Sequence, residues 1–155
     1  MTLTKRCEYA LRALIDIELA QRAGRPVLSA TELGAHQRIP TAFLEQILLQ
    51  LREAGFIESR RGKSGGYTFA KDPTNITIGD VVRVIDGPLA PIRCVSKTAY
   101  EPCSCPSEEH CGLHMVMQDV RNAISEILDR HTVADVAERA IKSHKKARVT
   151  LPFST

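Results

Sequence analysis

Several features that define other protein classes are missing from this sequence. No run approaches the roughly 20 consecutive apolar residues of a membrane-spanning helix, and residues 1–6 lead into an amphipathic pattern rather than a signal peptide. No nucleophile–base constellation is present. The segment Ser64-Gly65-Gly66 is too short for a phosphate loop and precedes no helix. We therefore expect a cytoplasmic protein with no membrane partner and no enzymatic activity.

The sequence also lacks the cysteine pattern of a disulfide-stabilised protein. It contains five cysteines, an odd number, and the thiols of cytoplasmic proteins are kept reduced. Four of the five lie close together between residues 94 and 111. A tight group of thiols in a reducing compartment indicates metal or redox chemistry rather than a disulfide framework.

A strong overall charge is missing too, since the net charge is only +3. The charges are unevenly distributed, however. Residues 1–71 carry 11 Lys and Arg against 7 Asp and Glu, whereas residues 72–155 carry 10 against 11. The basic excess therefore lies in the N-terminal half, as expected if that half faces nucleic-acid phosphates.

Three helical segments are predicted before residue 56. Apolar residues at helical spacing predict helices over about 4–23 and 41–54, and the capping-box pattern Ser29-Ala30-Thr31-Glu32 predicts a short helix from there to about His36. We expect Thr41 to cap the third helix. The second and third helices, joined by a short turn, form a predicted helix-turn-helix, although many such hairpins never contact DNA.

The next segment, residues 56–69, has the features of a wing. Two short alternating runs flank a basic, glycine-rich connection, which predicts a β-hairpin. The candidate DNA contacts are an adenine-reading glutamine near the start of the third helix, its neighbours, and basic side chains of the wing that suit phosphates or a narrow minor groove: Thr41, Phe43, Gln46, Arg60, Arg61 and Lys63.

A Thr77/Asp80 capping box predicts one more helix, through Ile85, which closes a winged helix-turn-helix domain over residues 1–87. From Leu113 to Arg130 apolar residues recur in a heptad-like stripe, which favours dimerisation through a long helix. A short helix through about Ile141 completes the dimerisation element of residues 113–141, and we expect a mobile tail over 142–155. The predicted fold is mainly α-helical with one small β-hairpin.

Residues 88–112 form a predicted loop that contains Cys94, Cys103, Cys105 and Cys111, followed by His114. Thiolates bind zinc, copper(I) or iron–sulfur clusters. The spacing C-x8-C-x-C-x5-C-x2-H matches poorly the paired knuckles of a structural zinc site. An iron–sulfur cluster is favoured, with zinc or cluster-free thiol oxidation as alternatives.

Several of these segments together resemble a bacterial family of winged-helix proteins. The similarity covers about residues 1–140 and rests on residues 3–11 (LTKRCEYAL), 42–48 (AFLEQIL), 61–67 (RGKSGGY) and 78–87 (IGDVV followed by IDG). The family comprises the iron–sulfur cluster regulators, nitric-oxide-sensitive repressors and rhizobial iron regulators.

The resemblance implies a homodimeric regulator, expected to be a repressor, that binds operator DNA and senses iron, redox or nitric oxide status. It implies a cluster bound by three loop cysteines, with a fourth ligand that differs between members. His114 and Glu8 match the known alternatives, and His36 is a third candidate. This chain departs from the pattern because it has four loop cysteines, so the middle ligand is Cys105 or Cys103 and the cluster is of two-iron or four-iron type. Cys7 is expected to be a buried apolar residue.

Overall fold

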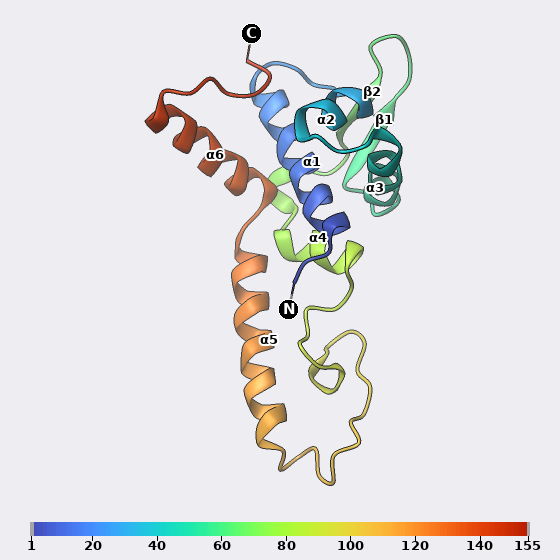
Figure 1. The fold of residues 1–155 in the computed structure, drawn as a ribbon, viewed down its shortest axis with the longest axis vertical. Coiled ribbons are helices and arrows are strands. Elements are labelled where there is room, and N and C mark those ends of the chain that lie inside the picture. The colour runs from blue at the N-terminus through green and yellow to red at the C-terminus, as the bar shows by residue number, and fades with distance from the viewer. Residues whose placement is uncertain (1, 155) are drawn as a thin grey trace.

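The computed structural model describes residues 2–154 and confirms a mainly helical fold with one antiparallel hairpin (Figure 1). The helices and strands are α1 (Lys5–Arg22), α2 (Ala30–Gln37), α3 (Thr41–Glu53), β1 (Ile57–Arg60), β2 (Gly66–Phe69), α4 (Ile78–Ile85), α5 (Gly112–Arg130) and α6 (Val133–Ala147), with short 3-10 helices η1 (Pro73–Asn75) and η2 (Arg93–Val95). Within these residues no helix has the length and apolar character needed to cross a bilayer.

Local sequence signals set the beginnings of three helices. Each of α2, α4 and α6 starts with a complete capping box, in which a hydroxyl accepts from the N3 amide and the N3 carboxylate accepts from the N-cap amide; the pairs are Ser29 with Glu32, Thr77 with Asp80, and Thr132 with Asp135. The prediction that Thr41 caps α3 is wrong. Pro40 (φ −55°, ψ 126°) is the N-cap, Thr41 is the first helical residue, and no side chain caps this helix.

The core of the first 87 residues lies around α1. Its fully buried members come from α1, α2, α3, β1 and the segments beside them, and include Leu14, Ile17, Leu33, Leu44 and Ile47. Helix α6 returns to cover α1, and its Val133 and Ala137 are fully buried. The winged-helix unit is therefore completed by α6, which follows α5 in the chain.

The hairpin pairs Ile57 with Phe69 and Arg60 with Gly66. It is held against the start of α2 by two backbone hydrogen bonds between Leu28 and Tyr67. A side chain at Gly66 would not fit, because its Cβ would lie 2.3 Å from the Leu28 carbonyl oxygen. Glycine at this position thus allows the backbone of Leu28 to lie beside the hairpin.

Helix α5 extends away from the winged-helix unit, and the loop from Pro88 to Cys111 runs beside it (Figure 1). Its C-terminal end is fixed by backbone hydrogen bonds from Ile78 N to His131 O (2.8 Å) and from Val133 N to Ile76 O (2.9 Å). The predicted apolar stripe divides into two parts. Ile124 and Leu128 pack toward α4, whereas Leu113, Val116, Val120 and Ile127 are exposed in the single chain.

The predicted end of the last helix was wrong. Helix α6 continues past Ile141 to Ala147, because residues 142–147 carry good helix formers and three basic side chains that interact favourably with the C-terminal end of the helix dipole. The chain then turns at Arg148 (φ 54°) and returns, so that Phe153 packs against His36 with ring centroids 4.8 Å apart. The polar composition of the tail did not show this contact.

Candidate DNA interface and metal centre

Helices α2 and α3 form the predicted helix-turn-helix. The turn at Arg38 takes a left-handed conformation (φ 55°), and the Ile39 amide donates to the Gly34 carbonyl at 2.9 Å. A Cβ at Gly34 would lie 2.9 Å from the Ile39 carbonyl, so a small residue is needed where the two helices approach. This is the geometry that allows a second helix to enter the major groove.

The outer face of α3 carries the residues predicted to contact DNA. Leu44, Ile47 and Leu48 point into the core, which leaves Phe43 and Gln46 exposed and Thr41 half-buried at the helix start. The ring of Phe43 meets the ring of Tyr9 edge-on, with centroids 6.0 Å apart. The structure therefore presents Gln46 to solvent and holds Phe43 partly in place from α1.

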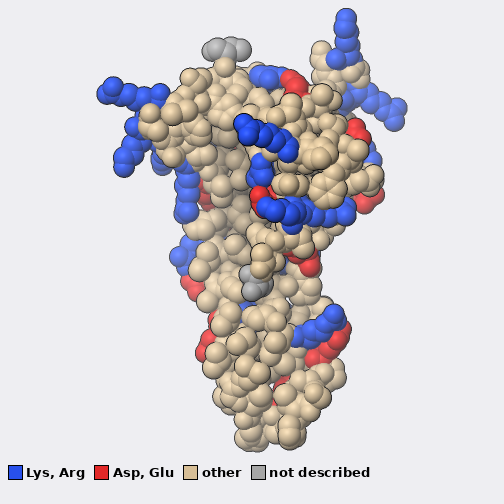
Figure 2. All heavy atoms as spheres, in the orientation of Figure 1, with Lys and Arg blue, Asp and Glu red and all other residues tan. Residues whose placement is uncertain are grey.

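Arg60, Arg61 and Lys63 are exposed at the wing. Figure 2 shows basic side chains projecting from the end of the molecule that carries the hairpin, while the opposite end has few charges. Arg60 lies 3.7 Å from a Glu58 carboxylate oxygen, and Arg61 and Lys63 form no ion pair within residues 2–154. Their positions suit contact with a phosphate backbone.

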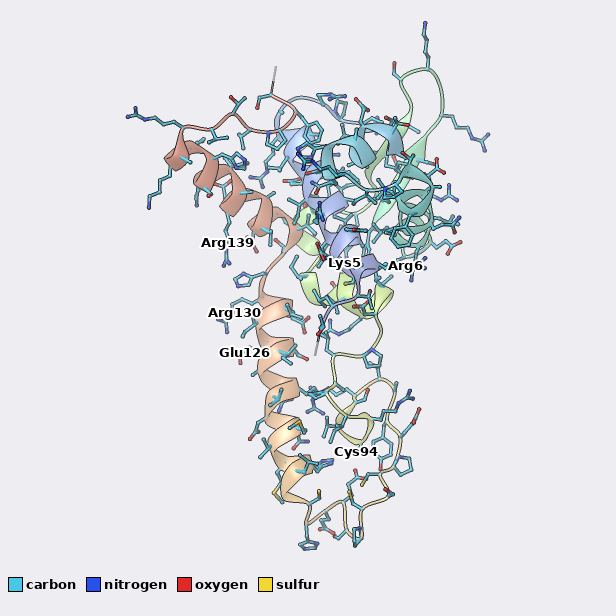
Figure 3. The ribbon with its side chains drawn as sticks, viewed as in Figure 1. Lys5, Arg6, Cys94, Glu126, Arg130 and Arg139 are labelled. Atoms are coloured by element: carbon cyan, nitrogen blue, oxygen red, sulfur yellow. The ribbon has the colours of Figure 1, made fainter. Side chains whose placement is uncertain are left out.

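The four loop cysteines and His114 line one cavity of about 290 Å³. Cys94 is buried in η2, Cys103 and Cys111 are half-buried, and Cys105 is exposed. Cys111 is the N-cap of α5, where its Sγ accepts a hydrogen bond from the His114 amide at 3.4 Å. Both ends of the loop are thus brought to the N-terminal end of α5, and Figure 3 shows Cys94 lying beside that helix.

The surroundings of Cys94 and Cys105 favour the protonated form of these two thiols. Burial raises the pKa of Cys94, and Cys103 and Glu108 raise it further. A hydrogen bond with Cys103, burial, and the proximity of Cys111 raise the pKa of Cys105 to about 12. No lysine or arginine contributes to either shift. A reactive redox cysteine normally has cationic neighbours that stabilise the thiolate, and Cys94 and Cys105 do not show that effect.

His114 supplies a nitrogen donor to the same cavity. Its Nδ1 is buried and forms no hydrogen bond within the described chain, and the nearest acidic atom is Glu108 Oε1 at 3.6 Å. A buried polar atom without a partner is costly, and an imidazole nitrogen is a common metal ligand. The donor set of four thiols and one imidazole therefore fits a group that binds sulfur and nitrogen.

The distances between the thiol and imidazole donors bear on the kind of metal group that they can hold. Across residues 2–154 no three His, Cys, Asp or Glu side chains lie close enough together to hold one metal ion. A single zinc ion needs four ligands within about 2.0–2.3 Å of it, whereas each iron of a cluster takes its own protein ligands. The donors therefore line one cavity without a preformed site for a single ion in the described residues.

The other two candidate ligands lie outside this pocket in the chain. Glu8 forms ion pairs with Lys5 (2.7 Å) and Arg12 (3.2 Å) at the start of α1, and Figure 3 shows Lys5 far from Cys94. His36 lies in α2, where its Nδ1 contacts Asp16 Oδ2 at 2.6 Å. Cys7 is fully buried, as predicted, and burial beside Asp86 raises its pKa to about 12.

A family model described as Rrf2, an iron-dependent transcriptional regulator, matches residues 3–139. The chain belongs to the Rrf2 family. It is a DNA-binding transcriptional regulator and not an enzyme.

Individual relatives of this Rrf2 regulator agree with that assignment. An rrf2-like regulator of helix-turn-helix type from Rhodobacter capsulatus is 39% identical over 136 residues, which are 86% of this chain and 91% of that protein. CymR of B. subtilis, described as the global cysteine regulator, has a TM-score of 0.72 at 29% identity and covers 90% of this chain and 98% of its own. IscR of T. potens has a TM-score of 0.69 at 27% identity, with coverage of 99% and 95%.

Two residues near the cysteines of this Rrf2 regulator were missed by the sequence analysis. Glu108 accepts hydrogen bonds from the Tyr100 hydroxyl (2.9 Å) and the Cys103 thiol (3.8 Å), and so links the middle of the loop. Arg121 of α5 is buried and donates to the carbonyl of Val95, next to Cys94. Neither has a sequence signal, because a loop without periodicity does not indicate which of its polar residues turn inward.

Proposed function

We propose that this Rrf2 regulator is a homodimer that controls transcription from operator DNA according to the state of an iron–sulfur cluster bound in the cysteine pocket. One observation carries the proposal: four thiols and an imidazole nitrogen without a hydrogen-bond partner surround a single cavity. The family description as iron-dependent regulators supports it. An iron–sulfur cluster would supply a group that responds to iron supply, oxidants and nitric oxide.

The proposed ligands are Cys94, Cys111, one or both of Cys103 and Cys105, and His114. Cys94 and Cys111 stand at the two ends of the loop, and His114 is in the first turn of α5. Thiols with raised pKa values must lose their protons when they bind iron. Loading is therefore expected to be favoured at higher pH and to release protons.

The dimer is proposed to form through the exposed side of α5. Leu113, Val116 and Ile127 are more than half exposed in the single chain, and a helix with an apolar stripe at heptad spacing is suited to pack against a second copy. Two winged helices would then be presented to two half-sites about one helical turn apart.

A chain of contacts connects the cysteine pocket to the recognition helix. Arg121 of α5 holds the carbonyl beside Cys94, and Asp129 of α5 pairs with Arg83 of α4 at 2.6 Å. Gln50 of α3 in turn donates to the Val84 carbonyl of α4 at 3.0 Å. A change in the contacts between the loop and α5 can therefore alter the position of α3. A sensor of this kind needs two such positions of the recognition helix, one for each state of the cysteine pocket.

The experiment is a measurement of DNA affinity by fluorescence anisotropy, with a fragment from upstream of the protein's own gene. Anaerobically purified protein is compared before and after removal of iron with a chelator. We expect the affinity to change by roughly tenfold, the usual range of coupling between two sites. Equal affinity in the two forms would contradict the proposal, and Gln46→Ala, which should weaken binding in both forms, controls for contact through α3.

A second candidate is thiol sensing without a cluster. Similarity to CymR, named as a cysteine regulator, and the proximity of Cys105 to both Cys103 and Cys111 favour it. Two of these thiols would lose two protons and two electrons to an oxidant and form a disulfide. Such a protein would be colourless and would respond to peroxide without iron, which separates it from the cluster-bound regulator.

A further inference from the structure

Arg121 is a buried cation without a countercharge. Its side chain is 9% exposed, and no carboxylate lies within ion-pair distance of it in residues 2–154. Its Nη1 donates to the Val95 carbonyl, while Nε and Nη2 donate to Asn122 Oδ1 at 3.1 and 2.7 Å. A guanidinium has five N–H donors, so two remain. A buried charge left uncompensated is strongly unfavourable.

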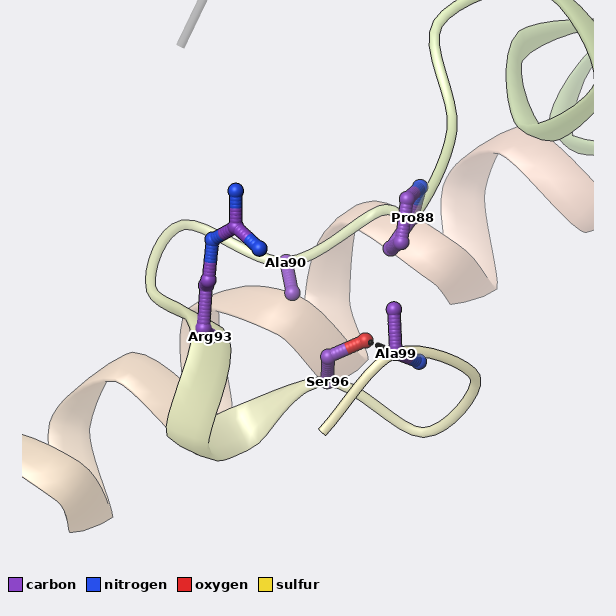
Figure 4. Close-up of a pocket in the computed structure, with 5 residues that line it drawn as sticks. All are labelled: Pro88, Ala90, Arg93, Ser96 and Ala99. Carbon is purple, nitrogen blue, oxygen red and sulfur yellow. Dashed lines mark hydrogen bonds between the residues drawn. The ribbon is translucent and has the colours of Figure 1, made fainter. Parts of the chain in front are cut away.

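Arg121 borders a cavity between α5 and the segment that precedes the cysteines. This cavity of about 110 Å³ adjoins a second one of about 210 Å³, and the two share Pro88, Ala90 and Ser96. Figure 4 shows the second cavity, with Arg93 and Ser96 beside it and the Ser96 hydroxyl bonded to the Ala99 amide. The smaller cavity shares no lining residue with the cavity of the four cysteines, whereas the larger one shares Arg93 with it.

The polar lining of the smaller cavity is cationic and hydroxylic. Lys97 forms no ion pair within the described chain, whereas Arg83 is already neutralised by Asp129 and Asp80. Ser96, Thr98 and Ser125 add hydroxyl groups that can donate hydrogen bonds. No acidic residue lines either cavity. The excess positive charge therefore comes from Arg121 and Lys97 and faces a small pocket that is partly open to solvent.

We propose that this cavity is a binding site for a small oxyanion, such as phosphate, sulfate or a short carboxylate. Arg121 supplies the buried charge and its two remaining N–H donors, Lys97 closes the site from the solvent side, and the hydroxyls complete the shell. A volume of about 110 Å³ is sufficient for an anion of a few atoms. Since Arg121 also holds the carbonyl next to Cys94, the bound anion would fix the start of the cysteine loop.

The test is thermal unfolding of the purified full-length protein in sodium phosphate, sulfate or succinate, each titrated against sodium chloride at constant ionic strength. We expect a saturable rise of several degrees in the unfolding midpoint with at least one of the three anions, because a ligand that binds the folded state stabilises it. Comparison of the three identifies whether a tetrahedral oxyanion or a carboxylate is preferred.

Variants separate this site from the DNA-binding surface, which can also bind anions. Arg121→Gln should abolish the saturable rise, and Lys97→Ala should weaken the apparent affinity about tenfold. Arg130→Gln, which removes an exposed arginine of the same helix that pairs with Glu126, should leave the rise unchanged. So should the double variant Arg61→Ala with Lys63→Ala in the wing.

The proposal fails if none of the three anions gives a saturable rise. It fails equally if the rise survives both Arg121→Gln and Lys97→Ala but disappears in the wing variant. Lys97 is exposed, so Lys97→Ala is expected to fold. If Arg121→Gln does not fold, the result for Lys97→Ala decides between the outcomes.

Discussion

The winged-helix unit (residues 2–87, covered by α6) and the cysteine-bearing arm (residues 88–132) differ in the contacts that stabilise them. Residues 2–87 surround a continuous apolar core, to which α6 adds Val133. Between Pro88 and Thr132, by contrast, the buried apolar residues are Leu89, Cys94 and Val95, and Ile124 and Leu128 are half-buried against the winged-helix unit. Many of the other contacts of this region are polar or involve sulfur. The first region can be ordered by its own packing, whereas the second depends on hydrogen bonds, thiols and surfaces left open in the single chain.

This difference matches the division of labour in a sensor. A winged-helix unit must keep one shape to recognise DNA, so it is built on a close-packed core whose disruption unfolds it. A sensing arm must change when its ligand or partner changes, so its order comes from contacts that a ligand can add or remove. The experiments below act on one region and measure the other.

The largest expected effect is the loss of iron from the arm. Cys111→Ala removes the thiol at the N-terminus of α5 and should reduce bound iron by more than about 90%, because a cluster needs that ligand. Far-UV circular dichroism should show an unchanged winged helix. Cys7→Ala is the matched control, since Cys7 is buried in α1 outside the pocket. Retention of full iron by Cys111→Ala would remove it from the ligand set.

The next effect concerns the core. Leu14→Ala, at a fully buried position of α1, should reduce the free energy of unfolding by about 2–5 kcal/mol. Leu113→Ala, at a position 58% exposed on α5, should leave urea unfolding almost unchanged and weaken self-association measured by analytical ultracentrifugation. If the two variants lost equal stability, the contrast between the regions would be wrong.

A smaller effect is expected at the wing. Arg61→Ala removes an exposed charge that forms no ion pair in the structure described here, and each lost phosphate contact lowers the slope of log affinity against log salt by about 0.9. Operator binding should weaken while the iron content stays the same. A slope that does not change would place Arg61 outside the DNA interface.

The smallest effect concerns the capping box of α2 in the winged-helix unit. The Ser29 amide and the Arg25 guanidinium lower the pKa of Glu32 below its usual 4.5. The stability that this carboxylate contributes is therefore present above about pH 4.5 and is lost as the pH falls through its lowered pKa. Glu32→Gln should cost less than about 1 kcal/mol at pH 7 and flatten the acid side of the stability profile measured in urea.

The sequence was most informative where structure is local. The capping boxes at Ser29, Thr77 and Thr132 mark helix starts because both partners lie within four residues of each other. The wing was predictable for the same reason. The four loop cysteines stood out because thiols rarely occur that close together without a shared role.

Contacts between distant segments were beyond the reach of the sequence. The packing of Phe153 on His36 and the position of Arg121 beside Val95 depend on how the chain folds back, and neither leaves a periodic pattern. The same holds for His114 and Glu8, which appeared equivalent as candidate ligands. The fold places His114 at the cysteine pocket and Glu8 in ion pairs on α1, so within one chain their surroundings differ completely.

The central claim, that the arm binds an iron–sulfur cluster, is tested most directly by chemical analysis of protein purified without oxygen. Iron and acid-labile sulfide are measured per chain, together with the visible absorption spectrum. The account predicts a coloured protein with iron and sulfide in equal amounts. A colourless protein that holds zinc or no metal, and no sulfide, would contradict it.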